Sequence, residues 1–198
     1  ILTGCLRISK ESIFTGLNNF EVVSIMDSMY DECFGFTDKE VQEILKYFNL
    51  SEHYADIREW YDGYHFVAGG PGIYNPFSLL NTFKYMRPED YWFETGTPSY
   101  LVELLKHTHY DLYELANTET DADVLNSIDS TSSNPVPVIY QSGYLTIKDY
   151  DSRFGIYKLG FPNLEVEEGF VKYLLPFYTS VSAPKTPFEI GRFVREVE

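Results

Sequence analysis

Histidines are the side chains of this chain best suited to metal or acid–base chemistry, and two of the four are close together. An extended backbone over His107-Thr108-His109 would place both imidazoles on one face, as a metal site requires. No third ligand follows at a metal-binding spacing, so surface or helix-end positions fit the histidines better. Ser, Thr and Asp are abundant, but none lies in a nucleophile elbow or a recognisable triad. The sequence therefore predicts no metal and no catalytic residue in this chain.

Phosphate binding is the second kind of chemistry to consider for these residue types. A nucleotide-hydrolysing loop needs the pattern G-x-x-x-x-G-K-[ST], because its backbone amides and its lysine hold the phosphates. The glycine-rich stretch Gly69-Gly70-Pro71-Gly72 has no following Lys, Ser or Thr, and we interpret it as a flexible loop. Asp27 follows an apolar segment, as a magnesium-binding aspartate would. Without a phosphate-binding loop upstream, that pattern does not predict a nucleotide site.

Acidic residues dominate the charge of the chain. Asp and Glu number 30, Lys and Arg number 15, and the net charge is −15. Such a surface repels a phosphate backbone, so we expect no direct nucleic-acid binding. Glu165, Glu167 and Glu168 cluster on an early helical turn, where interaction with the helix dipole explains them.

Composition predicts a folded protein without membrane contact. Hydrophobic residues make up 44% of the 198 residues and aromatic residues 17%, which is typical of a packed core. No apolar run approaches the roughly 18 residues of a membrane-spanning helix. Cys5 and Cys33 lie far apart, so we expect buried, reduced thiols and a cytoplasmic location. The chain opens within a strand-like segment and closes within a helical pattern, so we expect a fragment of a longer protein.

Helix-start signals predict much of the local structure. Thr37 and Glu40 form a capping box for a helix that carries Val41, Ile44, Leu45 and Phe48 on one face. Ser51 is expected to cap the next helix, which ends near residues 61–63. Three further helices are expected to open with a side-chain cap before a proline, at Asn75-Pro76, Thr97-Pro98 and Thr186-Pro187.

Strand signals are fewer. Residues 1–6 and 21–26 are strand candidates, and residues 144–148 and 155–159 alternate in polarity as a hairpin with a turn at 149–154. A helix ending near 141–143 precedes this hairpin, which is the order of a winged helix. A helix from Leu164 to about Leu175 follows, with Val166, Phe170 and Leu174 on one face. Residues 117–134, rich in Thr, Asp and Ser, are expected to form a mobile connection.

A family resemblance rests on short segments that run in order over residues 1 to 178. They are Leu2-Thr3-Gly4, Arg7-Ile8-Ser9-Lys10, Ser12-Ile13-Phe14, Gly16-Leu17-Asn18-Asn19, Gly35-Phe36-Thr37 with Glu40, Trp60-Tyr61-Asp62-Gly63-Tyr64, Tyr74-Asn75-Pro76, Tyr91-Trp92-Phe93 with Thr95-Gly96, Tyr140-Gln141-Ser142-Gly143-Tyr144-Leu145-Thr146-Ile147, and Leu159-Gly160-Phe161-Pro162-Asn163 with Glu165-Val166. On these segments the chain resembles the bacterial AAA-ATPase-like family, whose members often carry a C-terminal PD-(D/E)XK nuclease-like domain.

The resemblance implies a fold that is mainly α with minor β. Residues 1–34 would be the C-terminal edge of a P-loop ATPase core, and residues 35–110 a helical lid. Residues 111–179 would form a winged-helix-like subdomain, and residues 180–198 a linker and the start of a helix towards a further domain. The Walker A and Walker B segments, which would bind ATP and Mg, would lie upstream of this chain.

The resemblance also implies candidate nucleotide-sensing residues. Arg7, with Thr3 and Lys10 as weaker candidates, would lie just past a core strand, where a cation could sense a γ-phosphate. Ordinary solvent exposure or an ion pair is the alternative reading of Arg7. We favour this alternative.

Three lid residues could face the nucleotide on the same grounds. They are Asp62, Tyr74 and Asn75. Structural roles explain the same residues, because an Asp-Gly pair makes a turn and an Asn before Pro caps a helix. We favour the structural roles.

The function implied is that of a segment of an ATPase that couples ATP to an attached nuclease-like effector. The fragment itself is expected to hold no ATP or Mg, to hydrolyse no ATP and to cut no DNA. Its implied partners are its own ATPase core and nuclease-like domain, with a homo-oligomer as a further option. The alternative is a protein-interaction or oligomerisation module with an acidic winged helix and no nucleotide role.

Overall fold

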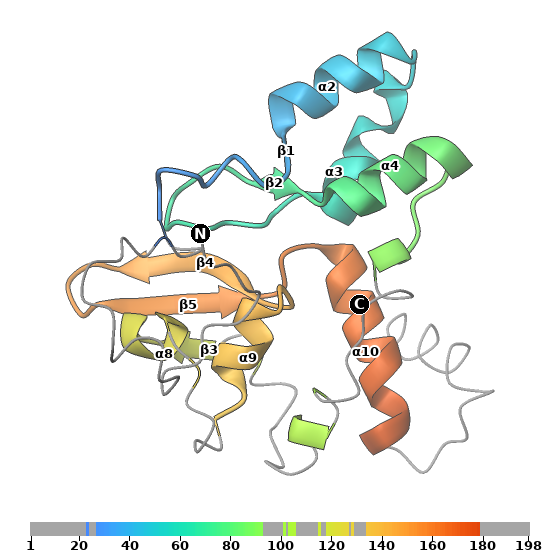
Figure 1. Cartoon of the computed structure of the whole chain (residues 1–198). Helices are drawn as coiled ribbons and strands as arrows, with labels where there is room; N and C mark the ends of the chain where they lie inside the picture. The colour runs from blue at the N-terminus through green and yellow to red at the C-terminus, as the bar shows by residue number, and fades with distance from the viewer. Residues whose placement is uncertain are drawn as a thin grey trace, which may run out of the picture.

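The computed structural model describes residues 23, 27–92, 101, 103–105, 115, 118–126, 128 and 134–178. Within these residues, two small antiparallel sheets are combined with helices. One sheet has two strands in the order β1-β2, and the other has three in the order β3-β5-β4. Figure 1 shows the helices α2, α3 and α4 grouped at one end of the molecule, and the three-stranded sheet with α8 and α9 at the other.

The N-terminal unit contains the first sheet and the first group of helices. Its elements are β1 (Phe36–Thr37), α2 (Asp38–Tyr47), the 3-10 turn η1 (Ser51–His53), α3 (Tyr54–Tyr61), β2 (Ile73–Tyr74) and α4 (Pro76–Tyr85). β1 and β2 pair with Phe36 opposite Tyr74 and Thr37 opposite Ile73. This pairing joins the start of α2 to the start of α4.

Side-chain caps start the two longer helices of this unit, as predicted. Thr37 N donates to Glu40 Oε2 at 2.8 Å and Glu40 N donates to Thr37 Oγ1 at 3.4 Å, which confirms the capping box of α2. Asn75 Oδ1 accepts a hydrogen bond from Phe77 N at 3.0 Å, which confirms the cap of α4. The predicted cap at Ser51 is wrong, because Ser51 begins a 3-10 turn and α3 starts three residues later without a side-chain cap.

The first hydrophobic core holds the helices of the N-terminal unit together. Its buried members are Val41, Leu45, Ile57, Tyr61, Tyr74 and Leu79. Val41 and Leu45 come from the predicted apolar face of α2, whereas Phe48 of that face is exposed because it follows the last turn of the helix. Cys33, predicted to be buried, is an exposed free thiol.

The C-terminal unit contains the second sheet. Its elements are β3 (Thr118–Thr120), α8 (Ala122–Asn126), α9 (Val136–Gln141), β4 (Thr146–Asp151), β5 (Ile156–Gly160) and α10 (Leu164–Tyr178). β5 is the central strand, and its Leu159 lies opposite Thr118 of β3 and Ile147 of β4. The predicted hairpin is confirmed, although β4 extends through Asp151 into the expected turn. The expectation of a mobile connection at 117–134 is wrong for residues 118–126, which form β3 and α8.

The second hydrophobic core lies between this sheet and the helices around it. Its buried members are Leu101, Leu105, Leu115, Leu125, Val136, Ile139, Tyr140, Tyr144, Leu145, Ile147, Leu159, Val166 and Phe170. Val166 and Phe170 come from the predicted apolar face of α10, four residues apart, as helix geometry requires. Trp92 packs against this core from the end of the N-terminal unit, and a tilted ring pair joins it to Tyr144.

The expected fold class is wrong. A mainly α chain with the edge of a P-loop ATPase core, a helical lid and a winged-helix-like subdomain was expected, but the described residues form a mixed α/β structure with two small antiparallel sheets. A P-loop core is built on parallel strands, and every strand pair described here is antiparallel. The strand candidates at 1–6 and 21–26 and the helix starts at Thr97 and Thr186 lie outside the described residues, apart from Val23, which is exposed.

Candidate functional site

Hydrogen bonds join the two units where their cores meet. His65 N donates to Thr146 Oγ1 at 2.7 Å, and the Thr146 hydroxyl donates to the His65 carbonyl at 2.9 Å. Ser78 Oγ donates to Glu165 Oε1 at 2.7 Å. We call these four residues the seam. The seam adds polar contacts to the apolar contact that Trp92 makes between the two units.

Glu165 is the most unusual member of the seam. Its side chain is 0% exposed, although carboxylates are rarely buried in full. Burial raises its pKa to about 7, and Asp90 adds to this, while hydrogen bonds from Trp92 N and Ser78 oppose it. Its Oε2 atom is buried and has no hydrogen-bond partner in the described part of the chain. The helix-dipole explanation offered for the acidic cluster therefore does not account for Glu165.

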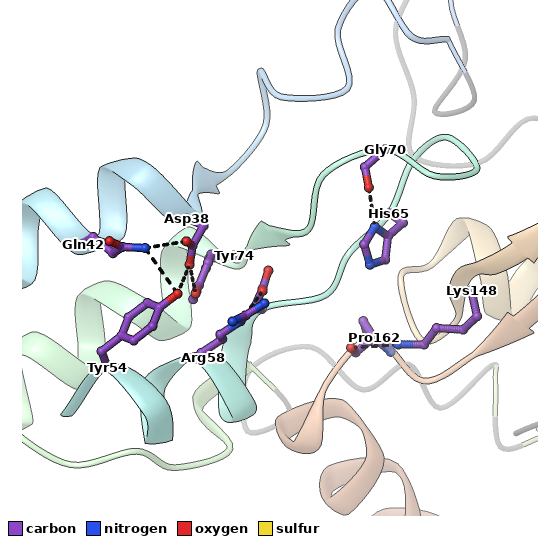
Figure 2. A network of polar contacts seen from close by, with 10 residues as sticks. Asp38, Gln42, Tyr54, Arg58, His65, Gly70, Tyr74, Lys148 and Pro162 are labelled. Atoms are coloured by element: carbon purple, nitrogen blue, oxygen red, sulfur yellow. Dashed lines mark hydrogen bonds and ion pairs between the residues drawn. The ribbon is translucent and has the colours of Figure 1, made fainter. Parts of the chain in front are cut away.

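Beside the seam, the residue after the end of α3 packs closely against the turn before α10. Gly63 has a φ of +117°, and a Cβ atom there would lie 2.2 Å from the carbonyl oxygen of Pro162. Only glycine fits this position. Lys148 Nζ donates to the same carbonyl at 3.1 Å, as Figure 2 shows. Partial burial lowers the pKa of Lys148, against the attraction of Glu167 and Asp62.

A carboxylate network lies on the α2 side of the seam. Asp38 Oδ1 accepts hydrogen bonds from the hydroxyls of Tyr74, at 2.7 Å, and Tyr54, at 2.8 Å. Asp38 Oδ2 accepts from Gln42 Nε2 at 2.7 Å, and Figure 2 shows the three donors converging on the one carboxylate. Partial burial would raise the pKa of Asp38, but these hydrogen bonds outweigh it and hold the pKa below its ordinary value. Burial and the bond to Asp38 raise the pKa of Tyr74.

Arg58 and Asp62 form an ion pair next to this network. Arg58 Nε lies 3.5 Å from Asp62 Oδ2 at an i,i+4 spacing, and the two side chains are 60% and 15% exposed. Burial raises the pKa of Asp62, although the backbone of Gly63 and the charge of Arg58 oppose it. A Cβ atom on Gly72 would lie 2.5 Å from Asp62 Oδ1. Asp62 is therefore enclosed between Arg58 and the glycine-rich loop.

An open pocket of about 460 Å³ lies on the solvent side of this ion pair. It is formed by one face of α3 and the turn before α10, and is lined by Tyr54, Ala55, Arg58, Glu59, Asp62, Pro162 and Asn163. Arg58 is the cation of this lining and has a largely exposed guanidinium. Glu59 and Asp62 are the two carboxylates of the same lining, so an anionic group that bound Arg58 would have to displace Asp62 and tolerate Glu59.

A second cleft, of about 260 Å³, lies between the two units. It is lined mainly by aromatic and small polar residues, which are Phe34, Tyr64, His65, Phe66, Ile73, Tyr74, Asn75, Pro76, Trp92, Tyr140, Gln141, Gly143, Leu145 and Thr146. Its volume falls just below the range of about 300–1,000 Å³ that is typical of small-molecule sites. His65 is held here by a contact of 3.0 Å between its Nδ1 and the Gly70 carbonyl.

The structure brings together two of the predicted lid residues. Tyr74 binds Asp38, and the charge of Asp62 acts on the Tyr74 hydroxyl, so both belong to one polar cluster. Asn75 is separate from it, because its side chain caps α4. The sensing candidates Arg7, Thr3 and Lys10 lie outside the described residues, as do His107 and His109.

Sequence reasoning missed Arg58 and Asp38 as site residues. The i,i+4 spacing of Arg58 and Asp62 is a signal that could have indicated an ion pair at the end of α3. Asp38 and Gln42 have the same spacing, but the contact of Asp38 with Tyr74 had no local signal, because the two residues lie 36 positions apart.

The described residues contain neither a metal-binding group nor a membrane-spanning helix. They contain no group of three or more His, Cys, Asp and Glu side chains able to hold a metal ion. Among the same residues, no helix has the length and apolar character needed to cross a membrane.

Comparison with known proteins gives one relative and no assigned fold. The chain is 35% identical over 181 residues to a protein of Azotobacter chroococcum mcd 1 described as "Uncharacterized protein in vnfD 5'region". The match covers 90% of this chain and 34% of that protein, so the chain spans about a third of the length of its relative. No family model matches the chain. No solved structure matches it, so no known fold supports a P-loop core here.

Proposed function

We propose that this chain is the coupling segment of a longer ATP-binding protein, and that it transmits the nucleotide state to an attached nuclease-like effector. The sequence resemblance supports the proposal, because its motifs run in order along the chain. The relative supports it as well, since two thirds of that protein have no counterpart in this chain and leave room for further domains.

The exposed guanidinium of Arg58 is the observation that carries the proposal. It lies 3.5 Å from Asp62, longer than a tight charge-assisted hydrogen bond, and it lines an open pocket. A phosphate group that reached this pocket would compete with Asp62 for the guanidinium. Loss of the Arg58 contact would raise the pKa of the largely buried Asp62 further.

The loop after Asp62 connects this exchange to the seam. Residues 63–73 leave Asp62, contact Thr146 through His65, and return to the first sheet at Ile73. Gly72, near the end of this loop, packs directly on Asp62. A change at Asp62 would therefore displace both ends of the loop and alter the junction between the two units.

The metal and most of the nucleotide contacts would belong to other parts of the longer protein. Mg²⁺ takes several oxygen ligands, and the described residues contain no group that could hold it. ATP bound elsewhere would supply a phosphate charge that changes on hydrolysis. The residues of this chain would bind part of that charge through Arg58 and move the loop after Asp62. We expect the chain alone to hydrolyse no ATP.

Titration of the longer protein with ATP and Mg²⁺ tests this function. We expect binding by the native protein, binding weakened about tenfold in the Arg58→Gln variant, and native affinity in the Arg153→Gln variant. Arg153 is a matched control, because it is an exposed arginine on the β4–β5 turn, away from the pocket. A longer protein that binds no ATP would contradict the function. Binding that is unaffected by Arg58→Gln would remove only the role of Arg58.

A further inference from the structure

The cleft between the two units has a mainly aromatic lining. Its aromatic residues are Phe34, Tyr64, Phe66, Tyr74, Trp92 and Tyr140. Tyr74 and Tyr140 are buried, whereas the other four keep part of their surface exposed. A ligand in the cleft therefore has aromatic side chains of both units within reach.

The same lining carries no permanent charge. Among the described residues that form it there is no Asp, Glu, Lys or Arg, although such residues make up 23% of the chain. Lys148 follows Thr146 of the lining by two positions, but its Nζ donates to the Pro162 carbonyl at 3.1 Å and the residue is not part of the cleft. The lining thus provides neither a permanent cation to attract an anionic ligand nor a carboxylate to accept a hydrogen bond from an N–H group.

Two carboxyl groups bind to residues of the lining without belonging to it. Asp38 Oδ1 accepts a hydrogen bond from the Tyr74 hydroxyl at 2.7 Å, as Figure 2 shows. Glu165 Oε1 accepts one from Trp92 N at 2.9 Å, and its charge also acts on Tyr64. Together with the net charge of −15, these carboxyl groups favour a positive ligand over a neutral or a negative one.

We propose that this cleft binds a small organic cation of the quaternary ammonium class, such as a choline-like molecule. The faces of Trp, Tyr and Phe rings attract such a cation, which has no N–H group to satisfy. A primary ammonium group has three N–H donors, and the described lining has no carboxylate to accept them. The size also fits, because an apolar cavity of about 150 Å³ holds benzene and the cleft has about 260 Å³.

This cleft is separate from the pocket used in the proposed function. The two linings share no residue, so either proposal can fail without the other. The lining takes Phe34 and Tyr64 from the N-terminal unit and Tyr140 from the C-terminal unit. A cation bound among these rings would therefore hold the two units together.

The fluorescence of Trp92 measures binding in the full chain. The chain has two tryptophans, and Trp60 is not part of the cleft, so the Trp60→Phe variant leaves Trp92 as the single reporter. The titration uses choline chloride at about pH 8, where imidazole rings such as that of His65 are neutral. We expect the emission of Trp92 to change with saturation as choline is added, and to stay constant in sodium chloride of equal concentration.

Two further probes separate the charge of choline from its shape. 3,3-Dimethylbutan-1-ol has the shape of choline without the charge, and ethanolamine has the charge but carries N–H groups in place of the methyl groups. We expect each to bind at least about tenfold more weakly than choline. No saturable change with choline, the same change with sodium chloride, or equal affinity for either of these probes would overturn the proposal.

A matched pair of phenylalanine substitutions locates the site. Phe34 lies in the lining and is 76% exposed, and Phe154 lies on the β4–β5 turn and is 66% exposed. Leucine keeps the apolar character of either position but removes the ring. We expect Phe34→Leu to weaken choline binding about threefold or more, and Phe154→Leu to leave it unchanged, with equal thermal unfolding of the two variants. No effect of Phe34→Leu, or an equal effect of both, would contradict binding in this cleft.

Discussion

Ser78 and Glu165 are 87 residues apart in the sequence, and a hydrogen bond of 2.7 Å joins them inside the protein. Ser78 belongs to α4 and Glu165 to the first turn of α10, so this one contact ties the N-terminal unit to the C-terminal unit. Trp92 N donates to the same Glu165 oxygen at 2.9 Å. Glu165 therefore has two donors on one oxygen and none on the other among the described residues, so the protonation of its carboxyl group affects the junction between the two units.

The contribution of Glu165 to the stability of the protein should fall as pH rises from 4.5 to about 7. Its folded pKa of about 7 exceeds the ordinary value of 4.5, so the folded state binds more protons between these pH values. Stability is therefore highest below the lower value and is lost as pH approaches the upper one, by at most about 3 kcal/mol. Urea unfolding at a series of pH values measures this loss.

The Glu165→Gln variant provides the comparison. It does not titrate, so its stability relative to the native protein should increase from pH 5 to pH 8, about the range of the shift. Glu119→Gln, an exposed substitution on β3, should follow the native profile throughout. A constant difference between Glu165→Gln and the native protein across this range would show that Glu165 does not titrate as described.

A methyl group at Gly63 should be far more costly than one at Gly155. Both glycines have positive φ, so alanine is strained at either site by about 1 kcal/mol. Only Gly63 faces a close neighbour, because its Cβ would lie 2.2 Å from the Pro162 carbonyl, whereas nothing lies within 4 Å at Gly155. We expect Gly63→Ala to lose about 3 kcal/mol or more, or to fail to fold. Equal melting temperatures of the two alanine variants would contradict the packing described.

Removing the Tyr74 hydroxyl should destabilise the protein more than removing that of Tyr54. Tyr74 is fully buried, so Tyr74→Phe takes a donor from Asp38 that water cannot replace, at a cost of about 2 kcal/mol. Tyr54 is partly exposed, and water can take its place in Tyr54→Phe.

The effect of Tyr74→Phe should also depend on pH. The folded pKa of Asp38 lies below its ordinary value of 3.8, so its stabilisation is present above that value and is lost as pH falls through the folded pKa. The difference between Tyr74→Phe and the native protein should therefore shrink in acid. Denaturant unfolding at neutral and acid pH measures it, and an equal loss from both tyrosine variants would contradict the network.

Features that depend on neighbouring residues were predictable from the sequence. The capping box of Thr37 and Glu40, the Asn75 cap and the β4–β5 hairpin all involve residues within a few positions of one another. The end of α3 at Asp62 was predictable for the same reason. Each is determined by local backbone chemistry and is independent of the rest of the fold.

Features that depend on distant partners were not predictable. The segment that holds β3 was expected to be a connection because it is rich in Thr, Asp and Ser, and the strand forms through its partner β5, some 40 positions away. The burial of Glu165 follows from its contact with Ser78, which no local pattern indicates. The expected P-loop core came from a family resemblance and not from residue chemistry, and the antiparallel sheets do not support it.

Hydrogen–deuterium exchange of residues 63–73 tests the central claim, that Arg58 couples an anionic group to the seam. The longer protein would be compared with and without saturating ATP, in its native form and as Arg58→Gln and Arg153→Gln. We predict that ATP changes the exchange of these amides in the native protein and in Arg153→Gln, but not in Arg58→Gln. An unchanged pattern in the native protein, or the same change in Arg58→Gln, would contradict the account.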